Sequence, residues 1–132
     1  MPQTPQPRGS ALLVEDEPFV AMVASQILAD EGFSVVEASS AAQALGELDG
    51  RPGDFALAVV DLGLPDMRGE ALVQALRSRA SALPIIIASG YGMGELQDIF
   101  TASVGVALVS KPYDTAALRG ALAKLGFAVG TD

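Results

Sequence analysis

The sequence predicts an α/β fold, a three-layer sandwich in which five helices flank a five-stranded parallel sheet. Two observations indicate this architecture. Short, almost entirely apolar runs alternate along the chain with segments whose apolar residues recur at helical spacing. Strands that are apolar on both faces are typical of a parallel sheet with helices above and below it. Half of the 132 residues are hydrophobic, so a substantial core can form without disulfides or metals.

The first β-α unit begins with the compact apolar run 11–14, which ends in three consecutive acidic residues. Residues 18–31 carry an apolar stripe at helical spacing, and Gly32 closes this helix. The stripe consists of Val20, Val23, Ala24, Ile27 and Leu28. Residues 33–38 are expected to form the second strand.

The second helix is expected to begin at Ser39 or Ser40, whose hydroxyl can cap it, and to run to about Leu48. Residues 49–53 combine glycine and proline and predict a loop. The fully apolar run 55–60 then predicts the third strand.

The second half of the chain repeats the alternation. We expect helices over 70–79, 95–103 and 115–125, and strands over 85–88 and 106–109. The pattern over 95–103 is the weakest of these. The organisation predicted is one domain over 10–126, with a flexible proline-containing leader over 1–9 and a short tail over 127–132.

The composition excludes several classes of function. The chain has no cysteine and no histidine, which excludes disulfides, His- or Cys-ligated zinc and catalytic triads built on these residues. Its net charge of −8 repels phosphate backbones, so no nucleic-acid partner is expected. No apolar run is long enough for a membrane span, and the N-terminus lacks a secretory signal. We therefore expect a cytoplasmic protein without a membrane partner.

Polar and charged residues collect where the apolar strands end. The first strand is followed by Glu15 and Asp16, the third by Asp61, the fourth by Ser89 and the fifth by Lys111. In open parallel sheets, ligands bind at the carboxyl ends of the strands. We therefore expect these side chains to form one site.

The chemistry of this site follows from its charge. Neighbouring carboxylates repel one another unless a cation neutralises them, and oxygen ligands alone suit Mg²⁺ or Mn²⁺. A carboxylate beside such an ion can attack a phosphoryl group, whose oxygens Lys111 and Ser89 could hold. A single acid after a strand has a more ordinary role as a helix cap or a solvated loop residue, which is the expectation for Glu17, Asp66, Asp114 and Asp132.

Four segments of the chain resemble the receiver domain of bacterial two-component response regulators. These segments are Leu12–Pro18, Val59–Gly69, Ser89–Tyr91 and Ser110–Tyr113, and the resemblance extends over nearly the whole chain. It implies a flavodoxin-like sheet with strand order 2-1-3-4-5. It also implies a single-domain regulator in a phosphorelay, which is a phosphoacceptor and not an enzyme acting on a separate substrate.

The resemblance assigns roles to the acidic residues. Asp61 corresponds to the phosphoacceptor and Asp16 to a direct Mg²⁺ ligand. Glu15 corresponds to an acid that acts largely through water, and the Gly63 carbonyl to a third ligand. Phosphorylation of Asp61 by a phosphohistidine would then switch the binding of a partner.

Further positions match the parts of a receiver that respond to phosphorylation. Ser89 corresponds to the switch hydroxyl, Gly90 to the small residue beside the phosphoryl group, and Lys111 to the family's lysine. Leu108 departs from the pattern, because most receivers have Tyr or Phe there.

Residues 84–92, which include Gly90 and Tyr91, resemble the Phe-Ala-Thr-Gly-Tyr signature of the FAT GUY receivers. These receivers also lack the switch aromatic. The resemblance implies a histidine kinase of the HWE or a related class as partner. It also favours a backbone rearrangement around the glycines of 90–94 as the switch.

The resemblance also indicates a docking surface. The core-facing stripe of the first helix leaves Phe19 and Met22 near the opposite face. In receivers, this helix and the loop after the fifth strand resemble a docking surface for histidine kinases and histidine phosphotransfer proteins. We therefore expect Phe19, Met22, Pro112 and Tyr113 to form such a patch.

Other functions are compatible with parts of the pattern. An aspartyl-nucleophile phosphatase of the haloacid-dehalogenase type needs a second acid two residues after the nucleophile, where this chain has Gly63. The acids after the first strand would repel a flavin phosphate. A receiver-shaped scaffold that is never phosphorylated is a further alternative, but the complete set of acids, hydroxyl and lysine argues against it. The output stays open: the protein could bind an unknown downstream protein, relay phosphoryl groups to a histidine phosphotransfer protein, or serve as a phosphate sink.

Overall fold

The computed structural model describes residues 9–51, 53–64, 66–67, 69–89, 105–110 and 114–127, with the backbone alone at 69, 70 and 89. The strands are β1 (Ser10–Val14), β2 (Ser34–Ala38), β3 (Phe55–Asp61), β4 (Ile85–Ser89) and β5 (Val106–Ser110). The helices are α1 (Pro18–Asp30), α2 (Ala41–Gly50), α3 (Gly69–Arg79) and α5 (Thr115–Lys124). The helix expected over 95–103 lies outside the described residues.

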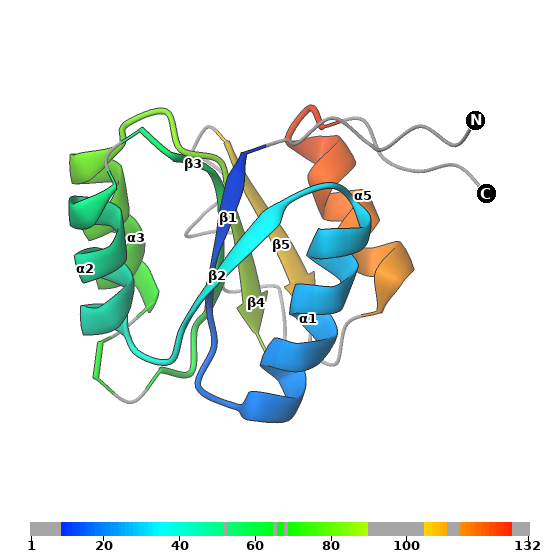
Figure 1. Cartoon of the computed structure of the whole chain (residues 1–132), viewed down its shortest axis with the longest axis horizontal. Coiled ribbons are helices and arrows are strands. Elements are labelled where there is room, and N and C mark those ends of the chain that lie inside the picture. Colours follow the sequence, from blue (N-terminus) through cyan, green and yellow to red (C-terminus); the bar gives the residue numbers. More distant parts are fainter. Residues whose placement is uncertain are drawn as a thin grey trace.

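The five strands form one parallel sheet in the order β2-β1-β3-β4-β5, which confirms the expected topology. Figure 1 shows α2 and α3 on one face of the sheet and α1 and α5 on the other. All five strands run in the same direction, so their carboxyl ends meet at one edge of the sheet, the lower edge in Figure 1. The loops that carry the expected site residues follow these ends.

Each face of the sheet carries its own core. Residues of β1 alternate between the two: Ala11 and Leu13 pack toward α1 and α5, whereas Leu12 and Val14 pack toward α2 and α3. All four are buried. Burial of both faces explains why β1 is apolar at successive positions and does not alternate with polar residues.

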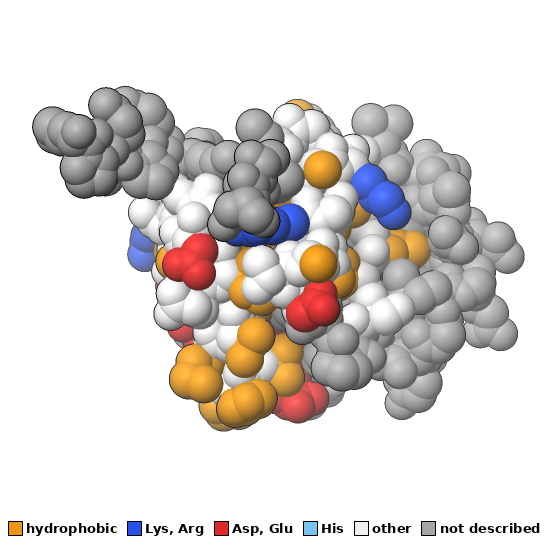
Figure 2. Space-filling view, turned by 90° about the vertical axis from the view of Figure 1, so that its right-hand side faces the viewer, with side chains coloured by type: hydrophobic (Ala, Val, Ile, Leu, Met, Phe, Trp, Pro, Cys, Tyr) orange, Lys and Arg blue, Asp and Glu red, His pale blue; other side chains and the backbone are white. Residues whose placement is uncertain are grey.

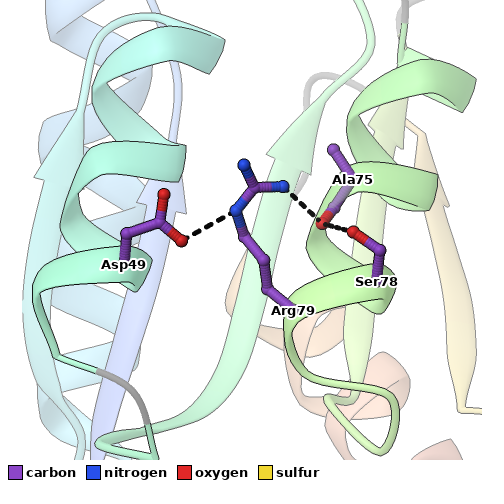
Figure 3. A network of polar contacts seen from close by, with 4 residues as sticks. All are labelled: Asp49, Ala75, Ser78 and Arg79. Atoms are coloured by element: carbon purple, nitrogen blue, oxygen red, sulfur yellow. Dashed lines mark hydrogen bonds and ion pairs between the residues drawn. The ribbon is translucent and has the colours of Figure 1, made fainter.

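The structure differs from the expected bounds at a few element ends. Strands β3, β4 and β5 each continue one residue further, through Asp61, Ser89 and Ser110. Helix α2 continues to Gly50, although 49–53 was expected to be a loop. There Asp49 accepts a 2.8 Å hydrogen bond from Arg79 of α3, and this contact holds the last turn of α2 (Figure 3).

The buried stripe of α1 is also shifted from the expected one. Ala21 is buried together with Ala24, Ile27 and Leu28, while Val20 and Val23 are only partly buried against the same core. The small side chain of Ala21 allows the helix to approach the sheet closely, and the two valines flank the contact. None of the described helices is long and apolar enough to cross a membrane.

Candidate functional site

The end of β1 places two acids at the edge of the sheet. The Glu15 N–H donates to the Ala38 carbonyl at 3.0 Å and so extends the pairing of β1 with β2. The Glu15 side chain is only 5% exposed, and its Oε2 accepts a 3.2 Å hydrogen bond from the Glu17 N–H. The Asp16 side chain is exposed. One carboxylate therefore lies within the protein and its neighbour faces solvent.

The end of β3 places the third acid. Asp61 is the last residue of the strand and is 5% exposed. Its Oδ1 accepts a 3.0 Å hydrogen bond from the Gly63 N–H. The Leu62 N–H donates to the Ala88 carbonyl of β4, which fixes the first residue of the following loop. The direction of the Asp61 carboxylate is thus determined by the backbone that follows it.

These three acids form one cluster. Glu15, Asp16 and Asp61 each offer a carboxylate oxygen, and the three oxygens lie within 4.8 Å of one another. Carboxylates at this spacing repel one another, and a divalent cation bound between them neutralises this repulsion. The donors are all oxygens, as a hard cation such as Mg²⁺ requires. The residues present fit the metal that the sequence predicted.

The other expected site residues lie around this edge or outside the described part of the chain. The backbone of Ser89 pairs with Ser110, one position beyond the pairing of Asp61 with Ala88. Leu108 on β5 is partly buried. Outside the described residues lie Gly90, Tyr91, Lys111, Pro112 and Tyr113.

The expected exposure of two apolar side chains of α1 is confirmed. Phe19 is 71% exposed and Met22 is 59% exposed, and both lie near the start of the helix, close in sequence to Asp16. Figure 2 shows hydrophobic side chains gathered at the lower end of the face that carries α1 and α5, with acidic side chains beside them. An exposed apolar patch therefore lies at the start of α1, the helix that follows the two acids at the end of β1.

Two of the three described acids with an expected ordinary role cap helices, each in a different way. Asp114 precedes α5 and accepts a 2.9 Å hydrogen bond from the Ala117 N–H, as an ordinary cap does. Asp66, however, caps a helix that precedes it in the sequence. Its carboxylate accepts hydrogen bonds from the N–H groups of Ala41 and Ala42 at the start of α2, at 3.0 and 3.1 Å. Glu17 occupies the N-cap position of α1 without a capping side-chain bond, and Asp132 lies outside the described residues.

Known proteins with the same strand order and an acidic cluster can be recognised by comparison. The family model of the response regulator receiver domain matches residues 11–123. The chain belongs to the receiver-domain family. Members of this family accept phosphoryl groups in two-component signalling and bind Mg²⁺ at an acidic cluster. The described residues of this receiver contain a matching acidic group in Glu15, Asp16 and Asp61.

Curated relatives of this receiver include sensor kinases and response regulators. The chain is 33% identical over 107 residues to the sensor kinase CckA of Brucella abortus. The aligned region covers 80% of this chain and 11% of the kinase. It is 34% identical over 124 residues to the photosynthetic apparatus regulatory protein RegA of Cereibacter sphaeroides, covering 90% of this chain and 63% of RegA. The receiver thus spans less than two thirds of the length of these relatives.

Solved structures show the same fold. The receiver domain of the hybrid histidine kinase CckA superposes with a TM-score of 0.74 at 28% identity, covering 89% of this chain and 98% of that domain. A chain of the CheX-CheY-BeF₃-Mg complex of Borrelia burgdorferi superposes with a TM-score of 0.81 at 20% identity, and the superposition covers 91% of this chain and 90% of that one. The flavodoxin-like fold is therefore confirmed. The FAT GUY subfamily and the HWE kinase stay predictions.

Proposed function

We propose that this receiver accepts a phosphoryl group from a phosphohistidine onto Asp61 in a Mg²⁺-dependent reaction and thereby changes its binding to a partner protein. The cluster of Glu15, Asp16 and Asp61 at the carboxyl ends of β1 and β3 is the observation that carries the proposal. The two most relevant features are a buried carboxylate at the end of a strand and two further acids beside it.

In this proposal, an oxygen of Asp61 attacks the phosphorus atom of the donor. A P–O bond forms, and the P–N bond to the donor histidine breaks with its electron pair moving to the imidazole nitrogen. The Gly63 N–H holds the Asp61 carboxylate in one orientation before the attack. Bound Mg²⁺ would supply positive charge for the oxygens of the phosphoryl group.

Besides Asp61 itself, the remaining acids hold the metal in this proposal. Asp16 is the direct ligand, because its exposed carboxylate can reach an ion in the solvent-facing part of the cluster. Glu15 is buried and bonded to the Glu17 N–H, which suits a contact through water. The Gly63 carbonyl is the third ligand proposed. Mn²⁺ can replace Mg²⁺, since it takes the same oxygen donors.

Two further side chains complete the proposed reaction. Lys111 and Ser89 would bind the phosphoryl oxygens, one by charge and the other by its hydroxyl. These two assignments, and that of Gly90 as the small residue beside the phosphoryl group, are supported by the sequence motifs alone. The role of Tyr91 within the switching segment has the same support.

We propose a histidine kinase, of the HWE or a related class, or a histidine phosphotransfer protein as the phosphoryl donor. The exposed Phe19 and Met22 support this part of the proposal, because they offer apolar contacts on the first turns of the helix that follows Glu15 and Asp16. Pro112 and Tyr113 would complete the docking patch. Exclusion of water around Asp61 during transfer would prevent hydrolysis of the phosphoryl group.

The proposal is tested by phosphorylation with a small-molecule donor. We expect the protein to gain the mass of one phosphoryl group when it is incubated with acetyl phosphate and Mg²⁺, and to gain none with EDTA. Asp61→Asn should gain none in either condition while keeping the circular dichroism spectrum of the wild type. Labelling of Asp61→Asn at the wild-type level would refute Asp61 as the acceptor.

A further inference from the structure

Asp66 connects two parts of the protein that are distant in sequence. It lies five residues after Asp61, in the loop between β3 and α3, and its two carboxylate oxygens accept one hydrogen bond each from Ala41 and Ala42. These are the first two residues of α2. The loop that follows the proposed phosphoacceptor is therefore bound directly to the N-terminus of α2.

The N-terminus of α2 is a favourable place for this carboxylate. The first N–H groups of a helix have no partner within it, and the helix dipole makes this end positive. Asp66 satisfies two of these donors, and the Ser40 hydroxyl accepts from a third, the Gln43 N–H, at 3.1 Å. The two bonds from Ala41 and Ala42 lower the pKa of Asp66 below its ordinary value, so the carboxylate is ionised at neutral pH.

Helix α2 is itself held in place. Ala41, Ala44 and Leu48 are buried in the core between the sheet and α3. At the other end of α2, Asp49 accepts a 2.8 Å hydrogen bond from Arg79, which also donates to the Ala75 carbonyl at 3.1 Å (Figure 3). A loop bound to the start of α2 is thus bound to a part of the protein with little freedom to move.

The strand before α2 is bonded to the part of the chain that carries the other acids. Ala38, three residues before α2 begins, accepts the hydrogen bond from the Glu15 N–H. The end of β1, which carries Glu15, is therefore bonded to the end of β2, and the loop after Asp61 is bonded through Asp66 to the start of α2. Only two residues separate these two points of attachment.

We infer that Asp66 is a positioning residue for the acidic cluster. By binding the start of α2, it holds the loop after β3 so that the Asp61 carboxylate and the Gly63 carbonyl keep their places opposite Glu15 and Asp16. Asp66 does not touch the reacting atoms. This inference rests on the proposed metal site, and it adds a residue that sets the spacing between the two ligand-bearing loops.

The experiment compares three variants of the whole protein without phosphorylation. Asp66→Ala removes both bonds to α2, and Asp66→Asn retains one oxygen acceptor. Ser40→Ala is the matched control, because it removes a cap from the same helix end without affecting the attachment of the β3 loop. Mg²⁺ affinity is measured by titration of the amide NMR signals, and the folded fraction by urea unfolding.

We expect Asp66→Ala to weaken Mg²⁺ binding about tenfold, the lower end of the effect of groups that orient metal ligands. Asp66→Asn should recover part of this loss, and Ser40→Ala should leave the affinity near that of the wild type. If Asp66→Ala does not fold, the comparison of Asp66→Asn with Ser40→Ala decides. The inference would be overturned if Asp66→Ala bound Mg²⁺ as tightly as the wild type, or if the Asp66 and Ser40 variants lost the same amount of Mg²⁺ affinity.

A second measurement needs no metal. The Gly63 N–H, which donates to Asp61, should show a changed amide shift in metal-free Asp66→Ala and an unchanged one in Ser40→Ala. An unchanged Gly63 signal in Asp66→Ala would overturn the positioning role. Absence of Mg²⁺ binding by the wild type would instead contradict the proposed function, so the two failures are distinguishable.

Discussion

Arg119 of α5 and Glu31 at the end of α1 form a 2.6 Å ion pair across 88 positions of the sequence. The Glu31 side chain is 3% exposed and that of Arg119 is 27% exposed. The pair joins the two helices that cover one face of the sheet. In the core on the same face of the sheet, the rings of Phe33 and Phe127 meet edge to face, with centroids 5.4 Å apart.

We expect Arg119→Met to lower the free energy of unfolding by about 1–3 kcal/mol, because it leaves the buried Glu31 carboxylate without this partner. Because Arg119 is partly exposed, we expect a smaller loss of stability than for a fully buried ion pair. Urea unfolding measures the free energy of unfolding of each variant. The control is Arg51→Met, which breaks the exposed pair with Glu47 and should cost less than about 1 kcal/mol. Equal losses in the two variants would contradict the prediction.

The sequence predicted the parts of the site that depend on local pattern. An apolar run that stops at a charged residue marks the end of a strand, and this signal located Glu15, Asp16 and Asp61. Parallel strands then bring such ends to one edge of the sheet, and the three acids do meet there. No knowledge of side-chain packing was needed for this step.

Contacts between segments distant in the sequence could not be predicted in the same way. Asp66 was expected to be a helix cap or a solvated loop residue, but a cap is ordinarily found just before its helix, and Asp66 binds a helix that begins 25 residues earlier. The Glu31–Arg119 pair is likewise invisible to any short window. The shift of the buried stripe of α1 to Ala21 has a different cause. Hydrophobicity alone predicts that Val20 and Val23 are buried, whereas close packing of the helix on the sheet favours burial of the small Ala21.

Mg²⁺ should stabilise the protein if the acidic cluster binds it. A metal that binds only the folded state adds about 1.4 kcal/mol of stability at a free concentration of ten times its Kd. The urea midpoint should therefore rise with added Mg²⁺ and fall back with EDTA.

The two acids after β1 should differ in their effect on this stabilisation. We expect Asp16→Ala to lose more of it than Glu15→Ala, because a direct ligand contributes more than one acting through water. Equal losses would show that the two acids are not distinguished as proposed. A larger loss in Glu15→Ala would reverse their roles.

The bonds of Asp66 to α2 should make part of the stability depend on pH. The folded-state pKa of Asp66 is lowered, first by the Ala41 N–H and then by the Ala42 N–H. The contribution is therefore complete above the ordinary aspartate pKa and is lost as the pH falls through the lowered folded-state pKa. The stability difference between wild type and Asp66→Asn should shrink over that acidic interval. A difference independent of pH would contradict this.

Phosphorylation should rearrange the backbone after β4 more than the Leu108 side chain. Residues 90, 92 and 94 are glycines, which lower the energetic cost of a new backbone conformation. Leu108 has no hydroxyl that could exchange buried for exposed partners. Addition of beryllofluoride and Mg²⁺ should shift the amide NMR signals of 89–99 most strongly. Larger shifts in β5 and α5, with 89–99 unchanged, would indicate a different switch.

The exposed apolar residues of α1 should affect phosphoryl transfer from a protein donor and not phosphorylation by a small molecule. Phe19→Ala combined with Met22→Ala should reduce phosphoryl transfer from the cognate histidine kinase at least about tenfold, because truncated apolar anchors often cost about 2 kcal/mol of binding. Labelling by acetyl phosphate should be unchanged, since a small donor needs no docking surface.

Gln26→Ala on the same helix is the control for this double variant, because Gln26 is exposed and polar. It should transfer like the wild type. Both proteins are compared at equal folded fraction, measured by urea unfolding. If the double variant transfers as fast as Gln26→Ala, then Phe19 and Met22 are ordinary surface residues, because single exposed apolar side chains are common on monomeric proteins. If it loses acetyl phosphate labelling as well, its defect lies in the acidic cluster and not in docking.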